Sequence, residues 1–118
     1  MILDTSILIE ILSDNSSIVE KLERVGESIS TTVITKYELL KAPKEADVLA
    51  LLGTMSAYDY DGKSAERAAK IFKDLKKKGK MINELDILIA SIAMTHDEML
   101  VTRDNDFKSV EHLKLLVL

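Results

Sequence analysis

The sequence of 118 residues contains no cysteine, one proline and four glycines. Without cysteine, the chain can form no disulfide, thiol nucleophile or thiolate metal site, which fits a reducing compartment. The glycines are scattered at positions 26, 53, 62 and 79, so there is no glycine-rich phosphate loop. His96 and His112 stand alone, without the spacing or thiolates of a zinc site. These absences exclude several common kinds of active site.

Long apolar runs are also missing. The apolar opening MILDTSILIEIL is interrupted by Asp4 and Glu10 and has no basic lead, so it fits neither a signal peptide nor a membrane span. Pro43 is the only proline, and there is no repeat or low-complexity segment that would mark a linker. We therefore expect one domain over residues 1–118 in a cytoplasmic protein with no membrane partner.

The net charge is −4, from 20 acidic and 16 basic residues. This balance argues mildly against a protein covered in positive charge, because nonspecific nucleic-acid binding draws mainly on Lys and Arg. It does not exclude a nuclease, since clustered acids that hold cations lower the net charge by themselves.

Short apolar strands alternate with helices along the chain. Strands are expected at 1–3, 28–32, 55–60, 99–102 and 113–118. Helices are expected at 5–12, 33–41, 46–52, 62–78 and 84–94, and the capping-box pattern at 17–20 opens one more. This alternation predicts an α/β fold with a central parallel sheet covered on both faces. Such sheets carry their sites at the carboxyl ends of the strands.

Five acidic residues fall at that predicted edge. One directly follows the first strand, and two follow the strand at 99–102. Another lies in the helix after the second strand, and the last lies in the first turn of a buried helix. In chain order they are Asp4, Glu38, Asp86, Asp104 and Asp106. Because the ends of parallel strands share an edge, these side chains could meet there.

The two acids in helices also have a structural interpretation. Glu38 lies three residues after Thr35, which matches a capping box. Asn83 could cap the buried helix and place Asp86 at its third position, where the helix dipole favours a negative charge. Each residue alone therefore fits a structural role.

The aspartates after the strands have structural alternatives too, since Asp4 could start a helix and Asp104 and Asp106 could form a turn. Separate roles do not explain why all five acids fall at one edge. Carboxylates gathered in one place repel, which raises their pKa values or destabilises the fold unless a positive charge lies between them. Mg²⁺ and Mn²⁺ take oxygen ligands and would supply that charge. Such a site suits phosphodiester hydrolysis.

Four motifs resemble, in order and spacing, the acidic motifs of PIN-domain ribonucleases, especially the short toxin type called VapC. They are LDTS with Asp4, YELL with Glu38, LDILIASIA with Asp86 and LVTRDNDF with Asp104. The resemblance runs over nearly the whole chain. It implies a three-layer α/β/α sandwich with a central parallel sheet, and an endoribonuclease that depends on Mg²⁺ or Mn²⁺.

The resemblance also implies roles for individual residues. The catalytic residues and metal ligands would be Asp4, Glu38, Asp86 and Asp104. Asp106 would be a further metal-site acid, and Ser6 and Thr102 would orient the site.

The family further implies a homodimer that a VapB-like antitoxin, a separate chain, neutralises. Ile11 and Leu12 are candidates for the dimer surface. One departure from the family is visible, because its common glycine before LVT is absent and His96-Asp97-Glu98 fills the turn. This change concerns the shape of a loop and no ligand.

Basic residues recur every three or four positions on the long helix at 62–78, so they share one face. They are Lys63, Arg67, Lys70, Lys73 and Lys77. The opposite face would be apolar, with Ala65, Ala68, Phe72 and Leu75, and Phe107 is a further core candidate. The basic face could be an RNA track in which Lys73 and Lys77 bind phosphates. The pattern favours the alternative, a solvated face on which Glu66 and Asp74 pair with Lys70.

Two other functions stay open. A receiver-like Mg²⁺-binding signalling domain would need two acids after the first strand and a lysine after a late strand. Here only Asp4 follows the first strand, and the late strand ends in Thr-Arg-Asp. A catalytically inactive PIN-like binding module would carry the same four acids as an enzyme, so the sequence does not separate the two.

Overall fold

The computed structural model describes all residues, 1–118, and centres on a parallel sheet of five strands. The strands are β1 (Ile2–Leu3), β2 (Ser30–Thr32), β3 (Ser56–Tyr58), β4 (Leu100–Thr102) and β5 (Leu115–Val117). They lie in the order β3-β2-β1-β4-β5, and every neighbouring pair is parallel. The predicted fold class is therefore confirmed. This order differs from the 2-1-3-4-5 order of receiver domains.

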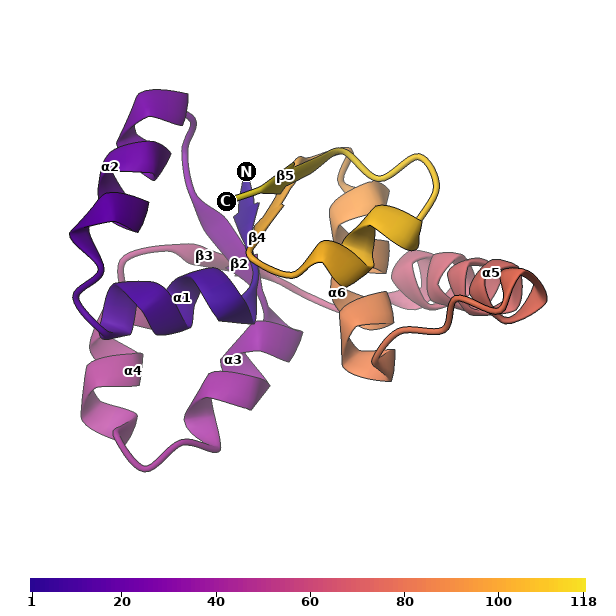
Figure 1. Cartoon of the computed structure of the whole chain (residues 1–118). Coiled ribbons are helices and arrows are strands. Elements are labelled where there is room, and N and C mark those ends of the chain that lie inside the picture. The colour runs from indigo at the N-terminus through magenta and orange to yellow at the C-terminus, as the bar shows by residue number, and fades with distance from the viewer.

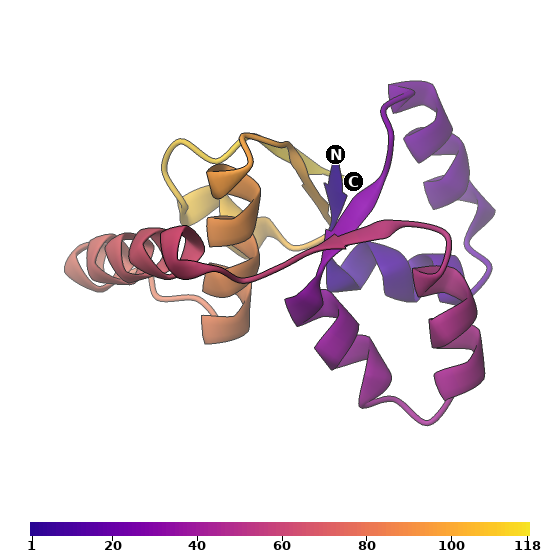
Figure 2. The same ribbon diagram turned by 180° about the vertical axis from the view of Figure 1, so that it is seen from behind.

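Helices cover both faces of the sheet (Figures 1 and 2). On one side lie α1 (Thr5–Leu12), α2 (Ser16–Val25), α3 (Val33–Leu40) and α4 (Glu45–Leu52). On the other side lie α5 (Gly62–Lys78), α6 (Glu84–Thr95) and the short 3-10 helix η1 (Asn105–Ser109). None of the helices combines the length and the apolar character needed to cross a membrane.

Two separate cores result from the alternation of side chains along the central strands. Ile2 and Leu100 pair across β1 and β4 and face the core beneath α5 and α6. Their neighbours Leu3 and Val101 also pair and face the core beneath α1 to α4. All four side chains are fully buried, and burying one such side chain contributes roughly 1.5–3 kcal/mol.

The start of α2 differs from the sequence prediction. Asn15 caps this helix by accepting a hydrogen bond from the Ile18 backbone N–H at 3.4 Å. The predicted capping box that begins at Ser17 is therefore wrong, because the chain is already helical at Ser16. Asparagine is among the best N-cap residues, and it starts the helix earlier.

The buried face of α5 is also rotated relative to the prediction. Ser64, Ala68, Ile71 and Leu75 are its buried residues. Phe72 is 38% exposed, so its predicted place in the core is wrong, whereas Phe107 is 1% exposed, as predicted. Ala65 is exposed too. The reason is that α6 packs along the Ala68–Ile71–Leu75 line, which leaves the neighbouring positions at the rim of the contact.

The turn without the family's glycine adopts a left-handed conformation at Asp97, where φ is +52°. Aspartate tolerates this conformation better than most residues because its short side chain bonds locally. Asp97 also forms a 2.8 Å ion pair with Lys114, the residue just before β5. The chain thus turns into β4 without a glycine at this position.

Candidate active site

Asp4 lies where β1 gives way to α1, and its side chain is 3% exposed. It caps α1 by accepting from the Ile7 N–H at 3.2 Å, which confirms its predicted role as a helix start. The Ser6 hydroxyl donates to Oδ1 at 2.6 Å, and the Thr102 hydroxyl donates to Oδ2. Burial raises the pKa of Asp4, and the hydrogen bonds from Ser6 and Thr102 oppose that rise. Its carboxylate is therefore firmly held.

Thr102 and Ser6 join the first helix to the end of β4. The pairing of Leu3 with Val101 brings the next residues, Asp4 and Thr102, side by side. The Thr102 hydroxyl accepts from the Asp104 N–H at 2.9 Å, and the Ser6 hydroxyl accepts from the Arg103 N–H at 3.0 Å. Both hydroxyls thus contact Asp4 and the loop after β4, as an orienting role requires.

The loop after β4 forms the turn that the sequence allowed. Asp104 accepts a hydrogen bond from the Asp106 N–H at 2.8 Å and starts η1. Asp104 is half-buried, and Asp106 is exposed. Arg103 turns away to form a 3.1 Å ion pair with Glu10, so no cation of this loop neutralises Asp104.

Glu38 is not part of a capping box. Thr32 caps α3 by accepting from the Thr35 N–H at 3.2 Å, so that prediction is wrong. The carboxylate of Glu38 instead accepts from the Thr5 hydroxyl at 2.7 Å, and this hydroxyl also lies 3.2 Å from that of Thr35. Sequence reasoning missed Thr5. The only signal was a hydroxyl residue next to Asp4, because its role depends on the packing of α1 against α3.

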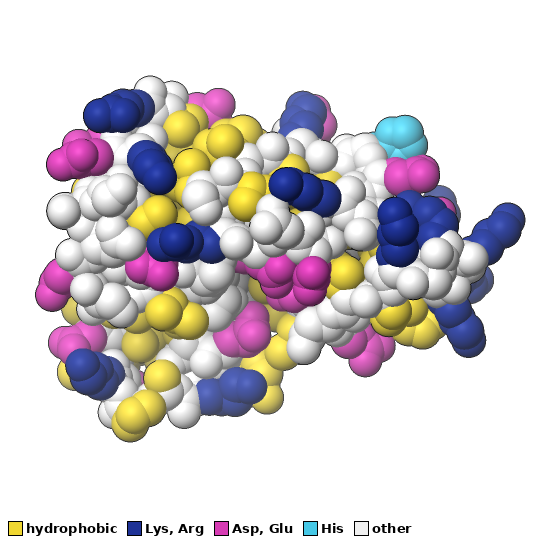
Figure 3. Space-filling model, viewed as in Figure 1, with side chains coloured by type: hydrophobic (Ala, Val, Ile, Leu, Met, Phe, Trp, Pro, Cys, Tyr) yellow, Lys and Arg dark blue, Asp and Glu magenta, His cyan; other side chains and the backbone are white.

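Asp86 lies in the first turn of α6, which Asn83 caps by accepting from the Leu85 N–H at 2.9 Å, as predicted. The pKa of Asp86 rises from its ordinary value of 3.8 to about 6. Burial is the largest cause, and the negative charges of four other carboxylates follow: Asp104, Glu38, Asp4 and Asp106. Acidic side chains gather in the middle of one face, between α1 and α6 (Figure 3). Each of the other four predicted acids therefore acts electrostatically on Asp86.

These carboxylates do not form a closed metal cage. No three His, Cys, Asp or Glu side chains are placed to hold one ion together. The donors are all oxygen atoms, and burial together with the charges of the neighbouring carboxylates raises the pKa of Asp86. Mg²⁺ usually binds through one or two carboxylates and keeps several waters, which substrate phosphates can replace. The residues therefore fit a hydrated Mg²⁺ or Mn²⁺ ion better than a fully coordinated one.

None of the basic residues of α5 forms an ion pair with these five acids. Asp74 forms a 2.8 Å ion pair with Lys78, so its predicted pairing with Lys70 is wrong. Lys73 lines a pocket together with Tyr60 and Phe72. A role for Lys73 and Lys77 in RNA binding stays a prediction.

The chain matches the PIN domain family over residues 1–113. It is 33% identical to "Ribonuclease VapC3" of Methanocaldococcus jannaschii over 91 residues, which cover 77% of this chain and 95% of the relative.

Solved structures share the fold. One is VapBC2 from Rickettsia felis bound to a DNA fragment of its promoter, with a TM-score of 0.86, 24% identity and coverage of 99% of this chain and 97% of the other. Another is VapBC-5 from Mycobacterium tuberculosis, with a TM-score of 0.71, 26% identity and coverage of 99% and 95%. The family match spans nearly the whole sequence, and the chain therefore belongs to the PIN domain family.

Proposed function

We propose that this protein is an endoribonuclease that cleaves RNA phosphodiester bonds with Mg²⁺ or Mn²⁺. The observation that carries the proposal is the gathering of carboxylates from distant segments around Asp86, whose pKa is raised first by burial and then by the charges of four other acids. None of the five acids forms an ion pair within the protein, and a divalent cation would relieve the repulsion between them. The relative from Methanocaldococcus jannaschii, which is named a ribonuclease, supports the same conclusion.

In this proposal the role of each acid in holding the metal ion follows from how deeply it is buried. Asp4 is deeply buried and held by three donors, so it is the rigid ligand. Glu38, Asp86 and Asp104 are half-buried and border the space that substrate would enter. When bound, a divalent ion would activate water and stabilise negative charge on the phosphate. Thr5 holds the Glu38 carboxylate in place.

We further propose that the enzyme is the toxin of a toxin-antitoxin pair, with a VapB-like antitoxin as partner and a homodimer as its assembly. Several proteins of the same fold were solved as such complexes, among them a toxin-antitoxin complex from Klebsiella pneumoniae. A receiver-like function is disfavoured because the strand order differs from that of receiver domains. An inactive binding module has the same acids and is separated only by experiment.

The test is cleavage of single-stranded RNA by the purified protein with Mg²⁺ or Mn²⁺. Asp4→Asn and Asp86→Asn should each abolish cleavage, and excess chelator should do the same. Asp59→Asn is the matched control, because Asp59 is exposed and lies outside the cluster. Cleavage that survives both substitutions or the chelator would contradict the metal site. A wild-type protein that binds metal and cuts no RNA would favour the binding module.

A further inference from the structure

Three basic side chains of α5 line one hollow, and none of them has an ion-pair partner. Lys63, Arg67 and Lys70 follow each other at intervals of four and three residues, so they share a face of the helix. They line a pocket of about 340 Å³ with Glu66 and Thr95, and no hydrophobic side chain contributes to it. No ion pair of the structure includes any of the three cations. Their charge exceeds that of Glu66, the one acid of the pocket.

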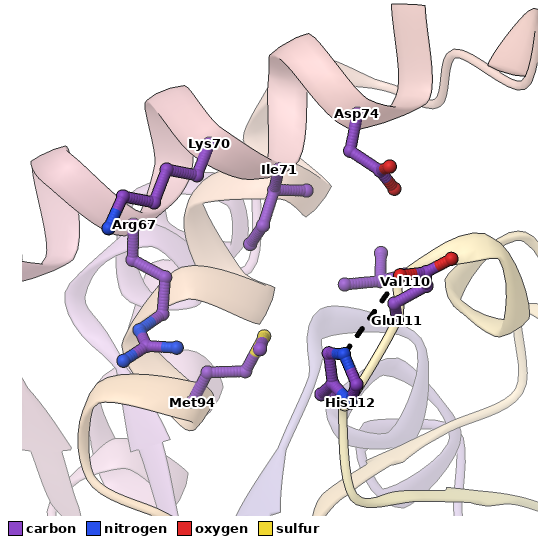
Figure 4. A pocket seen from close by; sticks show the side chains of 8 residues that line it. All are labelled: Arg67, Lys70, Ile71, Asp74, Met94, Val110, Glu111 and His112. Atoms are coloured by element: carbon purple, nitrogen blue, oxygen red, sulfur yellow. Dashed lines mark ion pairs between the residues drawn. The ribbon is translucent and has the colours of Figure 1, made fainter. Parts of the chain in front are cut away.

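A second pocket, of about 280 Å³, continues from the first and shares Arg67 and Lys70 with it. In Figure 4 these two side chains project from neighbouring turns of α5 and lie close together, while Glu111 and His112 lie on the opposite side. The apolar part of the lining is formed by Ile71, Met94 and Val110. The hollow thus combines two cations with an apolar wall.

The acids of the second pocket are already engaged elsewhere. Asp74 and Glu111 both contact the Lys78 ammonium group, at 2.8 and 3.5 Å. Arg67 and Lys70 have no such partner, so their charges remain available to a ligand. We call the surface formed by Lys63, Arg67, Lys70 and Thr95 the basic groove.

We infer that the basic groove binds phosphate groups of the RNA chain outside the site of cleavage, an inference that rests on the proposed function. Without a bound metal ion, a cluster of five carboxylates repels a polyanion, so affinity for RNA under these conditions has to come from cations elsewhere on the molecule. Helix α6 joins the two places, since Asp86 lies in its first turn and Thr95 at its end. Nine residues of helix span about 14 Å. These nine residues make about two and a half turns, so Asp86 and Thr95 lie on opposite sides of α6, and an RNA strand cut at the acids has to pass around this helix to reach the groove.

The chemistry of the groove suits single-stranded RNA. The guanidinium group of Arg67 can donate two parallel hydrogen bonds to a phosphate, and the ammonium group of Lys70 adds a point charge beside it. The apolar wall of the adjoining pocket, around Met94, offers a surface for a base or ribose of an unpaired strand. Basic residues that lie isolated on the surface lack this combination.

The experiment measures binding of a labelled single-stranded RNA in excess chelator, so that binding is separated from cleavage. The test variant is Arg67→Gln with Lys70→Gln. The matched control is Lys21→Gln with Arg24→Gln, which removes the same charge from the exposed face of α2. We expect the test variant to bind about tenfold more weakly at low salt, and the salt dependence of its affinity to fall by about 1.4, at roughly 0.7 for each lost contact with a single strand. The control should stay within about twofold of the wild type.

The two proposals can fail separately in this design. If the test variant binds RNA like the wild type, or if the control variant weakens binding equally, the groove is not an RNA site, whatever the cleavage assay shows. If the wild type cuts no RNA while the test variant loses binding, the groove stands and the proposed nuclease activity fails. Equal melting temperatures of the two variants would show that the comparison concerns binding and not folding. Stronger binding of duplex DNA than of the RNA would overturn the choice of ligand.

Discussion

The hydroxyl of Thr5 donates a hydrogen bond of 2.7 Å to Oε1 of Glu38. The two residues are 33 positions apart in the sequence and lie on α1 and α3. This bond fixes a half-buried carboxylate that nothing else in the structure holds, since Glu38 makes no ion pair. Thr5 is thus a positioning residue for the acidic cluster.

Replacing Thr5 with valine keeps the shape of the side chain and removes the hydroxyl. We expect RNA cleavage to fall about tenfold, because Glu38 is then free to adopt other rotamers, and the free energy of unfolding to fall by about 1 kcal/mol. Cleavage kinetics and urea unfolding measure the two effects. Thr5→Ser keeps the hydroxyl and should restore most of the activity, whereas equal losses in both variants would show that packing alone matters.

The pKa of Asp86 predicts an unusual dependence of stability on pH. In the unfolded chain its ordinary value is 3.8, and in the fold it rises to about 6. The folded state thus binds the proton more tightly, so this residue favours folding below about pH 4, and that contribution is lost as the pH rises through about 6. Without metal, Asp86→Asn should therefore be more stable than the wild type at pH 7.5 and lose this advantage at pH 4. Thermal unfolding across this range tests the sign.

The gain in stability of Asp86→Asn is limited in two ways. Because solvent screens the partly exposed side chain, the free energy of unfolding should rise by only about 1 kcal/mol, or the melting temperature by about 4 °C. Loss of the negative charge in the first turn of α6 costs roughly 0.3–1 kcal/mol. Glu84→Gln is the matched control, because Glu84 lies in the same turn but is exposed and does not contribute to the shift at Asp86. If both variants lose stability at pH 7.5, the carboxylates do not repel one another as the geometry indicates.

Strand ends were predictable because they need only local patterns. Apolar pairs such as Leu3 and Val101 mark the strands, and the residues that follow them, Asp4 and Thr102, lie side by side because the sheet is parallel. Faces of helices were less predictable. The sequence of α5 allowed Phe72 or Ile71 to face the core, and only contact with α6 selected Ile71.

Partners of side chains were the least predictable part of the site. Glu38 follows Thr35 at capping-box spacing, yet Thr32 caps the helix and Glu38 bonds Thr5. Likewise, Asp74 could reach Lys70 or Lys78 at helical spacing and pairs with Lys78, which Glu111 also contacts. These hydrogen-bond and ion-pair partners depend on segments that are distant in sequence, so no local sequence pattern predicts them.

Divalent cations should stabilise the folded protein if the acids hold one. A ligand present at 100 times its Kd raises the free energy of unfolding by about 2.7 kcal/mol. We expect Mn²⁺ at pH 7.5 to raise the melting temperature of the wild type by about 10 °C, and Asp4→Asn and Asp86→Asn to lose most of this rise. Asp59→Asn should keep it. A rise of the same size in all variants would place the cation elsewhere on the molecule.

The buried hydroxyl of Thr102 serves two polar groups at once, because it donates to Asp4 and accepts from the Asp104 N–H. Thr102→Val keeps the shape but leaves both groups without this partner, and we expect a loss of about 2 kcal/mol in urea unfolding at pH 7.5 with an unchanged m-value. The pKa of Asp4 is already raised by burial, and the bond from Thr102 lowers it. Removing that bond raises the pKa of Asp4 further, so part of the loss should disappear in acid, where Asp4 is protonated in both proteins.

Thr102→Ser keeps the hydroxyl and should lose only about 1 kcal/mol, for one buried methyl group, at every pH. A valine variant whose deficit does not change with pH would show that the hydroxyl contributes nothing to the charge state of Asp4.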